Sequence, residues 1–272
     1  MAEATQATGA QRIADAFAAA RTEGRAALMP YMMAGFPDRE TSAAVADAYA
    51  DAGADMVELG VPFSDPLADG PVIHAAATRA LASGTTLDDA LELCERIAPR
   101  VPVVPMTYVN MVLARGAAEF AHSLSTAGAA GAIVPDLPPE EADEIAAALR
   151  DAGLALVPLV APTTPPDRLR AICKSAEGFV YVVSDTRVTG ERDQLPPRLT
   201  ELVEAVHGCS SAPVAVGFGI GTPEQVAAVG AIADGVIVGS RLVRAVGEAD
   251  GQGAAAAAVR EFIASAKTAM EA

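Results

Sequence analysis

Short apolar runs alternate with helical stretches along the whole chain, and this alternation limits the possible folds more than any other feature. A repeated strand–helix unit is typical of an α/β protein with a parallel sheet. Helices are expected between the strands, with an additional one over 10–22 and a last one over about 253–270. The expected strands cover residues 27–33, 55–59, 102–107, 131–135, 155–159, 178–184, 213–216 and 234–238.

Eight such units predict a single (β/α)8 barrel, the TIM-barrel fold, with an extra N-terminal helix. A doubly wound open sheet shares the alternation and is the alternative. Two features favour the barrel. No Gly-x-Gly-x-x-Gly motif follows the first strand, and glycine-rich turns follow the seventh and eighth strands, where barrels commonly bind phosphate. We expect residues 1–9 to form a disordered leader and residues 10–272 to form one catalytic barrel domain.

Composition excludes several classes of protein. The net charge, 19 − 35 = −16, argues against a nucleic-acid partner, since binding to that backbone needs clustered Lys and Arg. The chain lacks the uncharged apolar run of about 18 residues that a membrane span requires, and its N-terminus lacks the features of a signal peptide. The widely spaced Cys94, Cys173 and Cys209 suit a reducing cytoplasm and predict neither a disulfide framework nor a metal site.

The second expected strand carries a carboxylate among apolar residues, in the run Met56-Val57-Glu58-Leu59. Side chains alternate faces along a strand, so Met56 and Glu58 share one face while Val57 and Leu59 share the other. An unpaired charge is costly to bury, and barrel active sites lie at the C-terminal ends of the strands. We therefore expect Glu58 to act as a general acid or base with a raised pKa. The alternative is a structural Glu paired with an arginine or tyrosine.

The loop after Glu58 is rich in Pro, Gly and Asp and carries two further carboxylates. Asp69 is expected to orient or stabilise an N–H group or a cation of the substrate, or alternatively to be a turn residue in Ala-Asp-Gly-Pro. Asp65, in Ser-Asp-Pro, is better explained as a turn residue. Asp136 follows the fourth expected strand and is either a turn or N-cap residue or a direct member of the site.

Two glycine-rich turns predict a phosphate site. The first, over 217–221, precedes Thr222-Pro223-Glu224-Gln225, a capping-box sequence with proline at the first helical position. The second, Gly239-Ser240, opens another expected helix. Free backbone N–H groups at helix N-termini bind anions, so two such ends at one rim would form a phosphate cradle. The alternative is that both are merely tight turns.

The sequence lacks the residues that two other kinds of lyase site require. A Schiff-base aldolase needs a lysine at a strand end, whereas Lys174 and Lys267 both fall in expected helices. A metal-dependent lyase needs clustered histidines and carboxylates, whereas His74, His122 and His207 are scattered. The chemistry that remains is acid/base catalysis by carboxylates on a phosphorylated small molecule, without metal or covalent lysine.

The loop Glu-Leu-Gly-Val-Pro-Phe-Ser-Asp-Pro-Leu-Ala-Asp-Gly-Pro, residues 58–71, resembles the signature of the tryptophan synthase alpha subunit family. Shorter pieces resemble the family in the same order along nearly the whole chain: 30–37, 107–110, 134–138, 179–181 with 188–190, 217–220 and 238–240.

The resemblance implies a (β/α)8 barrel that cleaves indole-3-glycerol phosphate to indole and glyceraldehyde 3-phosphate by a retro-aldol reaction. It implies that Glu58 protonates indole C3 and takes the proton of the glycerol hydroxyl. Asp69 would bind the indole N–H and stabilise the positive charge that develops there. Tyr181 would stand beside the catalytic glutamate. The implied phosphate and loop contacts are Thr189, Gly190, Gly219, Gly239 and Ser240, and the implied indole pocket is Phe218, Tyr31, Met106, Ile73 and Ile133.

The resemblance also implies a partner, a beta subunit that carries pyridoxal phosphate in an alpha2-beta2 tetramer, and no cofactor on this chain. The implied contact surface is Pro62, Asp65, Pro66, Asn110 and Asp136.

Three positions depart from the family pattern: Arg187 stands where glycine is usual, His74 stands where glutamine is frequent, and the segment 111–115 lacks the usual second Asn. These departures leave other readings open. They are a stand-alone lyase releasing free indole, a non-catalytic barrel that binds or activates a partner, and a phosphate-binding isomerase.

Overall fold

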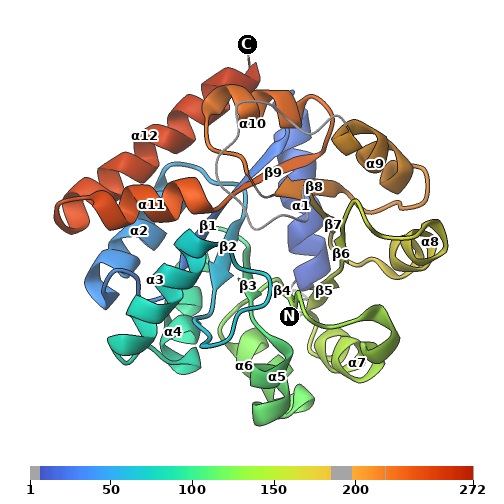
Figure 1. Cartoon of the computed structure of the whole chain (residues 1–272), viewed down its shortest axis with the longest axis horizontal. Helices are drawn as coiled ribbons and strands as arrows, with labels where there is room; N and C mark the ends of the chain where they lie inside the picture. Colours follow the sequence, from blue (N-terminus) through green and yellow to red (C-terminus); the bar gives the residue numbers. More distant parts are fainter. Residues whose placement is uncertain (1–6, 185–197, 218, 272) are drawn as a thin grey trace, which may run out of the picture.

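The computed structural model describes residues 7–184, 198–217 and 219–271, and Figure 1 shows its strands at the centre of a ring of helices. All neighbouring strands pair in parallel, in the order β5-β4-β3-β2-β1-β9-β8-β7-β6. The predicted (β/α)8 barrel is confirmed. The strands are β1 (Ala27–Met33), β2 (Val57–Gly60), β3 (Val103–Met106), β4 (Gly131–Ile133), β5 (Ala155–Val157), β6 (Leu159–Val160), β7 (Val180–Val183), β8 (Val214–Gly217) and β9 (Gly235–Val238).

The fifth predicted strand, 155–159, is interrupted, and this corrects the sequence analysis. It forms two pieces: β5, which pairs with β4, and β6, which pairs with β7. Pro158 separates them, because proline has no N–H group to give to the sheet. Its carbonyl still accepts a hydrogen bond from the Tyr181 N–H at 2.9 Å. The two ends of the strand order are therefore joined through one residue, which closes the barrel.

The helices begin and end within a few residues of the predicted positions, because capping residues mark several of the ends. Helix α1 starts at Gly9, and the Thr8 side chain accepts a hydrogen bond from the Gln11 N–H at 3.2 Å. The helices are α1 (Gly9–Thr22), α2 (Arg39–Asp51), α3 (Pro71–Ala82), α4 (Leu87–Ile97), α5 (Val109–Arg115), α6 (Ala117–Thr126), the 3-10 turn η1 (Pro139–Glu141), α7 (Asp143–Asp151), α8 (Pro166–Ser175), α9 (Arg198–His207), α10 (Pro223–Gly230), α11 (Ser240–Glu248) and α12 (Gly251–Glu271).

The strands separate two apolar cores. On β1, Met29 and Tyr31 belong to the core inside the barrel, whereas Leu28 and Met32 belong to the core between strands and helices. This alternation follows from the two-residue period of a strand. Both faces are buried along β1, so the strand reads as a continuous apolar run.

Helix α1 closes the N-terminal end of the barrel. The Phe17 ring lies 5.8 Å from the ring of Phe179, next to the first residues of β7. The Arg12 guanidinium donates hydrogen bonds to the carbonyls of Ala98 (2.6 Å) and Gly128 (2.7 Å). These contacts give the barrel a packed floor, so the interior opens at the C-terminal ends of the strands.

Aspartates at the starts of two strands hold the neighbouring strands at this floor. Asp55, before β2, accepts a hydrogen bond from the Leu28 N–H at 2.7 Å, and Asp234, before β9, accepts one from the Val214 N–H at 2.9 Å. Asp55 also pairs with the buried Arg25 guanidinium at 2.6 Å. These carboxylates stabilise the fold, because they lie at the N-terminal face of the barrel, whereas barrel active sites lie at the C-terminal face.

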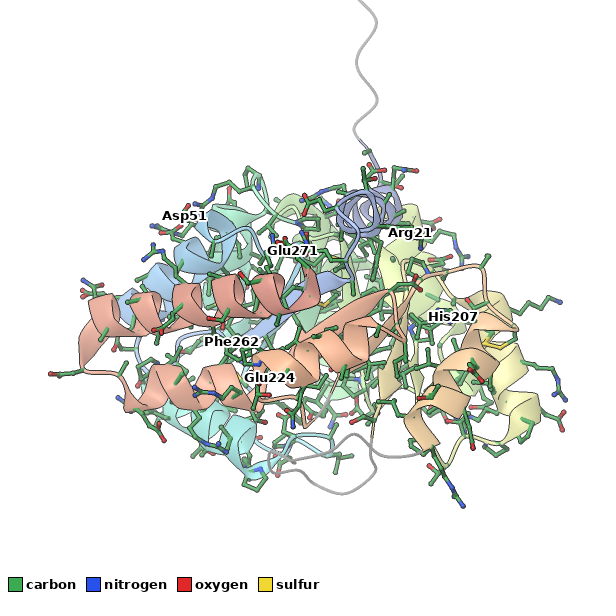
Figure 2. All side chains as sticks on the ribbon, turned by 90° about the horizontal axis from the view of Figure 1, so that it is seen from above. Arg21, Asp51, His207, Glu224, Phe262 and Glu271 are labelled. Carbon is green, nitrogen blue, oxygen red and sulfur yellow. A yellow bond between two sulfur atoms is a disulfide. The ribbon has the colours of Figure 1, made fainter. Side chains whose placement is uncertain are left out.

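The last helix, α12, completes the outer ring by packing on α2, α10 and α11. Its buried residues recur at helical spacing and form one apolar stripe. Figure 2 shows α12, in red, across the near side of the molecule, with Phe262 labelled. The stripe consists of Ala255, Ala256, Val259, Phe262, Ile263 and Ala266.

The cysteines differ from the prediction. Cys173 on α8 and Cys209 just after α9 form a disulfide, drawn in yellow in Figure 2, with their Cα atoms 5.6 Å apart. Cys94 is buried and free. The pairing was missed because it depends on the packing of α8 beside α9, and cysteine spacing alone does not give connectivity.

Within the described residues, no helix is both long enough and apolar enough to cross a membrane.

Candidate active site

Glu58 lies inside the barrel on β2 and is 1% exposed. It stands beside Tyr31 of β1 and Val104 of β3 in the parallel register. Met56, two residues earlier, also faces the interior, while Val57 and Leu59 face the helices, as the alternation predicted. Burial raises the pKa of Glu58 from 4.5 to about 8, and the charge of Asp69 adds to the rise. Glu58 is therefore a protonated acid at neutral pH.

The loop after β2 places Asp69 close enough to Glu58 for the two carboxyl groups to interact. The Tyr108 hydroxyl donates a hydrogen bond to the Asp69 carboxylate and accepts one from the Ala68 N–H at 3.2 Å. The Tyr108 ring stacks on Phe63 of the same loop, with centroids 5.1 Å apart. Burial raises the pKa of Asp69 to about 6, although the Tyr108 hydrogen bond and His74 oppose the rise. Asp69 is consequently a carboxylate at neutral pH, while Glu58 still carries its proton.

Tyr108 was not among the predicted site residues, yet its contacts tie the loop after β2 to the end of β3. The available signal was its position directly after the third strand, at the rim where functional side chains gather.

Two tyrosines flank the carboxylates inside the barrel. Tyr31 and Tyr181 are each 4% exposed. Each hydroxyl occupies the space above a glycine of the next strand. A Cβ on Gly60 would lie 2.0 Å from the Tyr31 oxygen, and one on Gly217 would lie 2.4 Å from the Tyr181 oxygen. Burial raises the pKa of both phenols well above 10, helped by the two carboxylates, so both stay protonated.

Apolar side chains line the same interior. Met106 and Ile133 end neighbouring strands and are paired in register, and Ile73 comes from α3, the helix that follows the Asp69 loop. All three are buried and belong to the interior core with Tyr31 and Tyr181. The carboxylates thus face an apolar pocket wall suited to an aromatic ring.

The two helix N-termini of the predicted phosphate cradle differ in their capping. Helix α10 has the expected capping box, and Gln225 accepts hydrogen bonds from the N–H groups of Gly221 (2.7 Å) and Thr222 (3.2 Å). Its first turn is therefore satisfied by its own side chains and is not open to a ligand. Helix α11 differs, because its N-cap Gly239 makes no side-chain capping bond. Among the described residues, no side chain caps the first turn of α11 at Ser240, and the left-handed turn at Gly219 (φ 76°) follows the neighbouring strand β8, so these two turns remain the candidate anion-binding position.

Comparison with known proteins decides the family. The family model described as tryptophan synthase alpha chain matches residues 17–271. The tryptophan synthase alpha chain of Prochlorococcus marinus (strain MIT 9313) is 50% identical over 235 residues, 85% of this chain and 86% of the relative. That of Roseiflexus castenholzii is 48% identical over 256 residues, 93% of this chain and 97% of the relative. The chain belongs to the tryptophan synthase alpha chain family.

Solved structures from tryptophan synthases have the same fold as this chain. A structure of Mycobacterium tuberculosis tryptophan synthase has a TM-score of 0.89 at 38% identity and covers 98% of this chain and 100% of its own. The tryptophan synthase subunit alpha of Legionella pneumophila has a TM-score of 0.85 at 35% identity, covering 95% and 98%. This chain is accordingly a carbon–carbon lyase of tryptophan biosynthesis and the alpha component of tryptophan synthase, a membership that implies a beta subunit partner.

Three residues expected in the alpha-chain site, Thr189 and Gly190 of the sixth loop and Phe218, lie outside the described residues, as does Arg187, the departure from the family pattern in that loop. The described residues Glu58, Asp69, Tyr31, Tyr181 and those of the apolar wall lie together at the mouth and interior of the barrel.

The expected partner surface is only partly exposed in this alpha chain. Asp65 and Asn110 are exposed and Pro66 is half-buried, whereas Pro62 is buried. Asp136 accepts a hydrogen bond from the Val109 N–H at 2.9 Å and so caps α5 from the neighbouring loop. Asp136 is not itself an N-cap residue, because the N-cap of α5 is Tyr108 and that of η1 is Pro138; its carboxylate reaches the first turn of α5 from a different loop.

A separate cavity of about 370 Å³ lies at the opposite end, between α1 and α9. Its polar groups pair with one another: Asp234 contacts Arg21 and His207, each at 3.0 Å. Figure 2 labels Arg21 and His207 on this side of the molecule. Because these groups stabilise the strand starts, we do not assign the chemistry to this end. In the described part of the chain, no three His, Cys, Asp or Glu side chains gather as a metal site.

Proposed function

We propose that Glu58 and Asp69 cleave indole-3-glycerol phosphate to indole and glyceraldehyde 3-phosphate. The observation that carries this proposal is the contrast between two neighbouring carboxyl groups. Burial holds the pKa of Glu58 at about 8 and that of Asp69 at about 6. Near pH 7 Glu58 is therefore a protonated acid and Asp69 an anion. When the pKa values of two neighbouring carboxyl groups differ in this way, one group can act as a general acid and the other can stabilise positive charge.

The two roles fit a retro-aldol cleavage. Glu58 gives its proton to C3 of the indole ring, and the ring nitrogen becomes positively charged. The Asp69 carboxylate stabilises that charge and accepts the ring N–H. Glu58, now ionised, takes the proton of the hydroxyl on the adjacent carbon, that oxygen forms the aldehyde C=O, and the electron pair of the broken C–C bond returns to the ring. One proton moves from the hydroxyl to C3 overall, and Glu58 ends protonated as it began.

The remaining contacts follow from the pocket. The apolar wall of Met106, Ile73 and Ile133 suits the indole ring. The open N-terminus of α11 at Gly239-Ser240, with Gly219, suits the phosphate. Thr189, Gly190 and Phe218, which the resemblance adds to these contacts, stay predictions.

The partner is proposed to be a beta subunit in an alpha2-beta2 assembly in the cytoplasm. The rim outside the active site supports this, because it exposes apolar side chains beside Asp65 and Asn110. Leu67 is 83% exposed and Leu113 is 63% exposed, and such apolar side chains are suited to burial in an interface. Pyridoxal phosphate is assigned to the beta subunit, and the proton transfers proposed here are made by the Glu58 carboxyl group of the alpha chain.

The test is indole release from indole-3-glycerol phosphate by the purified chain, alone and with a beta subunit. Glu58→Gln and Asp69→Asn should each lower kcat by at least about 10²-fold. Asp65→Asn, an exposed change in the same loop, should leave turnover by the chain alone unchanged. Normal turnover by Glu58→Gln would refute the assignment. A rise in turnover on adding the beta subunit would support the assembly, and full activity alone with no rise would contradict it.

A further inference from the structure

Within the part of the chain that the structure describes, two buried polar atoms on the neighbouring strands β1 and β2 have no hydrogen-bond partner. Among the described residues, the Tyr31 hydroxyl and the Glu58 Oε2 atom make no hydrogen bond, although both are shielded from solvent. The two residues are directly paired in the register of β1 and β2. Nearly all buried polar groups in proteins are hydrogen-bonded, because leaving one unpaired is costly. A pair of such atoms at an active site points to a ligand that supplies both bonds.

The Tyr31 hydroxyl lies on the solvent side of Glu58. Its oxygen sits against Gly60, two residues beyond Glu58 on the same inward face of β2, where a Cβ would approach it to 2.0 Å. Glycine at this position therefore leaves room for the hydroxyl. A substrate that reaches Glu58 from the mouth of the barrel passes this group.

Tyr31 also lies between Glu58 and the start of α11, where the phosphate group is proposed to bind. Tyr31 is on β1, and the sheet order β9–β1–β2 places this strand between β9, which ends at the Gly239 turn, and β2, which carries Glu58. A Cβ on Gly239 would lie 3.7 Å from the Tyr31 Cβ. A three-carbon chain with its phosphate at the start of α11 and its reacting carbon at Glu58 must cross Tyr31. The part of the substrate that crosses there carries hydroxyl groups.

The character of Tyr31 fixes the direction of the hydrogen bond. Burial, with the charges of Asp69 and Glu58, raises the pKa of its phenol well above 10, so it remains protonated throughout the reaction. A neutral phenol beside a site where an oxygen loses its proton is a donor aimed at developing negative charge.

We propose that Tyr31 is a further catalytic residue, whose hydroxyl donates a hydrogen bond to the substrate hydroxyl oxygen that Glu58 deprotonates. This inference rests on the proposed function of Glu58. The oxygen gains negative charge as its proton moves to Glu58 and before the C=O bond is complete, and the hydrogen bond stabilises it during that interval. Tyr31 keeps its own proton, so the proton balance of the reaction is unchanged.

The test compares Tyr31→Phe with Tyr49→Phe. Tyr49 is fully buried on α2, and its hydroxyl donates a 3.1 Å hydrogen bond to the Tyr31 carbonyl. Tyr31→Phe should lower kcat about 10- to 100-fold, at or below the lower end of the loss for an oxyanion donor. Tyr31→Phe should leave Tm unchanged or raise it, because the Tyr31 hydroxyl makes no hydrogen bond within the described protein that the substitution could remove. Tyr49→Phe should do the reverse, lowering Tm by about 2–4 °C with normal kcat.

Two further measurements separate the explanations. An indole-3-alkyl phosphate without hydroxyl groups on its three-carbon chain should bind equally to wild type and Tyr31→Phe by calorimetry. Weaker binding to the variant, a loss of Tm, or unchanged kcat would each overturn the inference. Glu58→Gln is assayed in parallel. If it is inactive while Tyr31→Phe is normal, the inference on Tyr31 fails alone, and if Glu58→Gln is active, the proposed function fails as well.

Discussion

Replacing Glu58 by glutamine should make the protein more stable at neutral pH. The wild-type native state holds a proton on this buried carboxyl group up to a pH of about 8, whereas the unfolded chain releases it near the ordinary pKa of 4.5. Between these values the native state binds more protons than the unfolded state, so stability falls as pH rises. Glutamine resembles the protonated acid in shape and cannot ionise, so the variant escapes this loss.

The magnitude follows from the shift. For each pH unit above 4.5, the free energy of unfolding of the wild type falls by about 1.4 kcal/mol, until the pH reaches about 8. At pH 7 the accumulated cost is about 3 kcal/mol, which is a large share of the roughly 5–15 kcal/mol that stabilises a typical protein. Stability from this group is fully present below pH 4.5 and is lost across the window from 4.5 to 8.

The assay is urea unfolding of both proteins at several pH values across that window. The quantity to follow is the difference in the free energy of unfolding relative to its value at pH 4.5, which removes any constant effect of the amide group. Glu92→Gln, an exposed change on α4, is the matched control and should give a flat difference. A flat difference for Glu58→Gln as well would refute the raised pKa and with it the acid role at neutral pH.

Three more predictions follow from the contacts. The pH profile of kcat/KM should be bell-shaped with limbs near 6 and 8, because Asp69 must be ionised and Glu58 protonated, and a profile flat from 5 to 9 would contradict both roles. Asp136→Ala should lower Tm by about 2–4 °C, measured by calorimetry, because α5 loses its cap; an unchanged Tm would show that the cap contributes little. Thiol titration in denaturant should find one free thiol before reduction and three after it, whereas three at the outset would exclude the bond between Cys173 and Cys209.

Most strands were predictable because parallel strands buried on both faces form continuous apolar runs. The run 27–33 became β1 with the same bounds. The break at Pro158 was not predicted, since the run 155–159 looks continuous when only its apolar character is considered. Proline weakens a strand assignment through its missing N–H group, and that rule was available in the sequence.

Some features of the site could also be predicted from the sequence, and others could not. Glu58 could be predicted because a charge inside an apolar strand has few structural explanations. The contacts of Tyr108 and the capping role of Asp136 could not, because each depends on how loops from different strands meet at the rim. The capping box of α10 was predicted, but its consequence was missed: a helix that satisfies its own first turn has no donors left for phosphate.

The open end of α11 has a consequence for how the substrate arrives. A phosphate bound there would be held by backbone N–H groups, within a protein whose net charge is −16. Such donors attract an anion only at close range, while the field of the whole molecule repels it at a distance. The Debye length is about 10 Å at 0.1 M salt, so added salt screens the repulsion and leaves the close contacts largely intact. Substrate capture should therefore become faster as ionic strength rises, the opposite of what a lysine- or arginine-lined phosphate site would show.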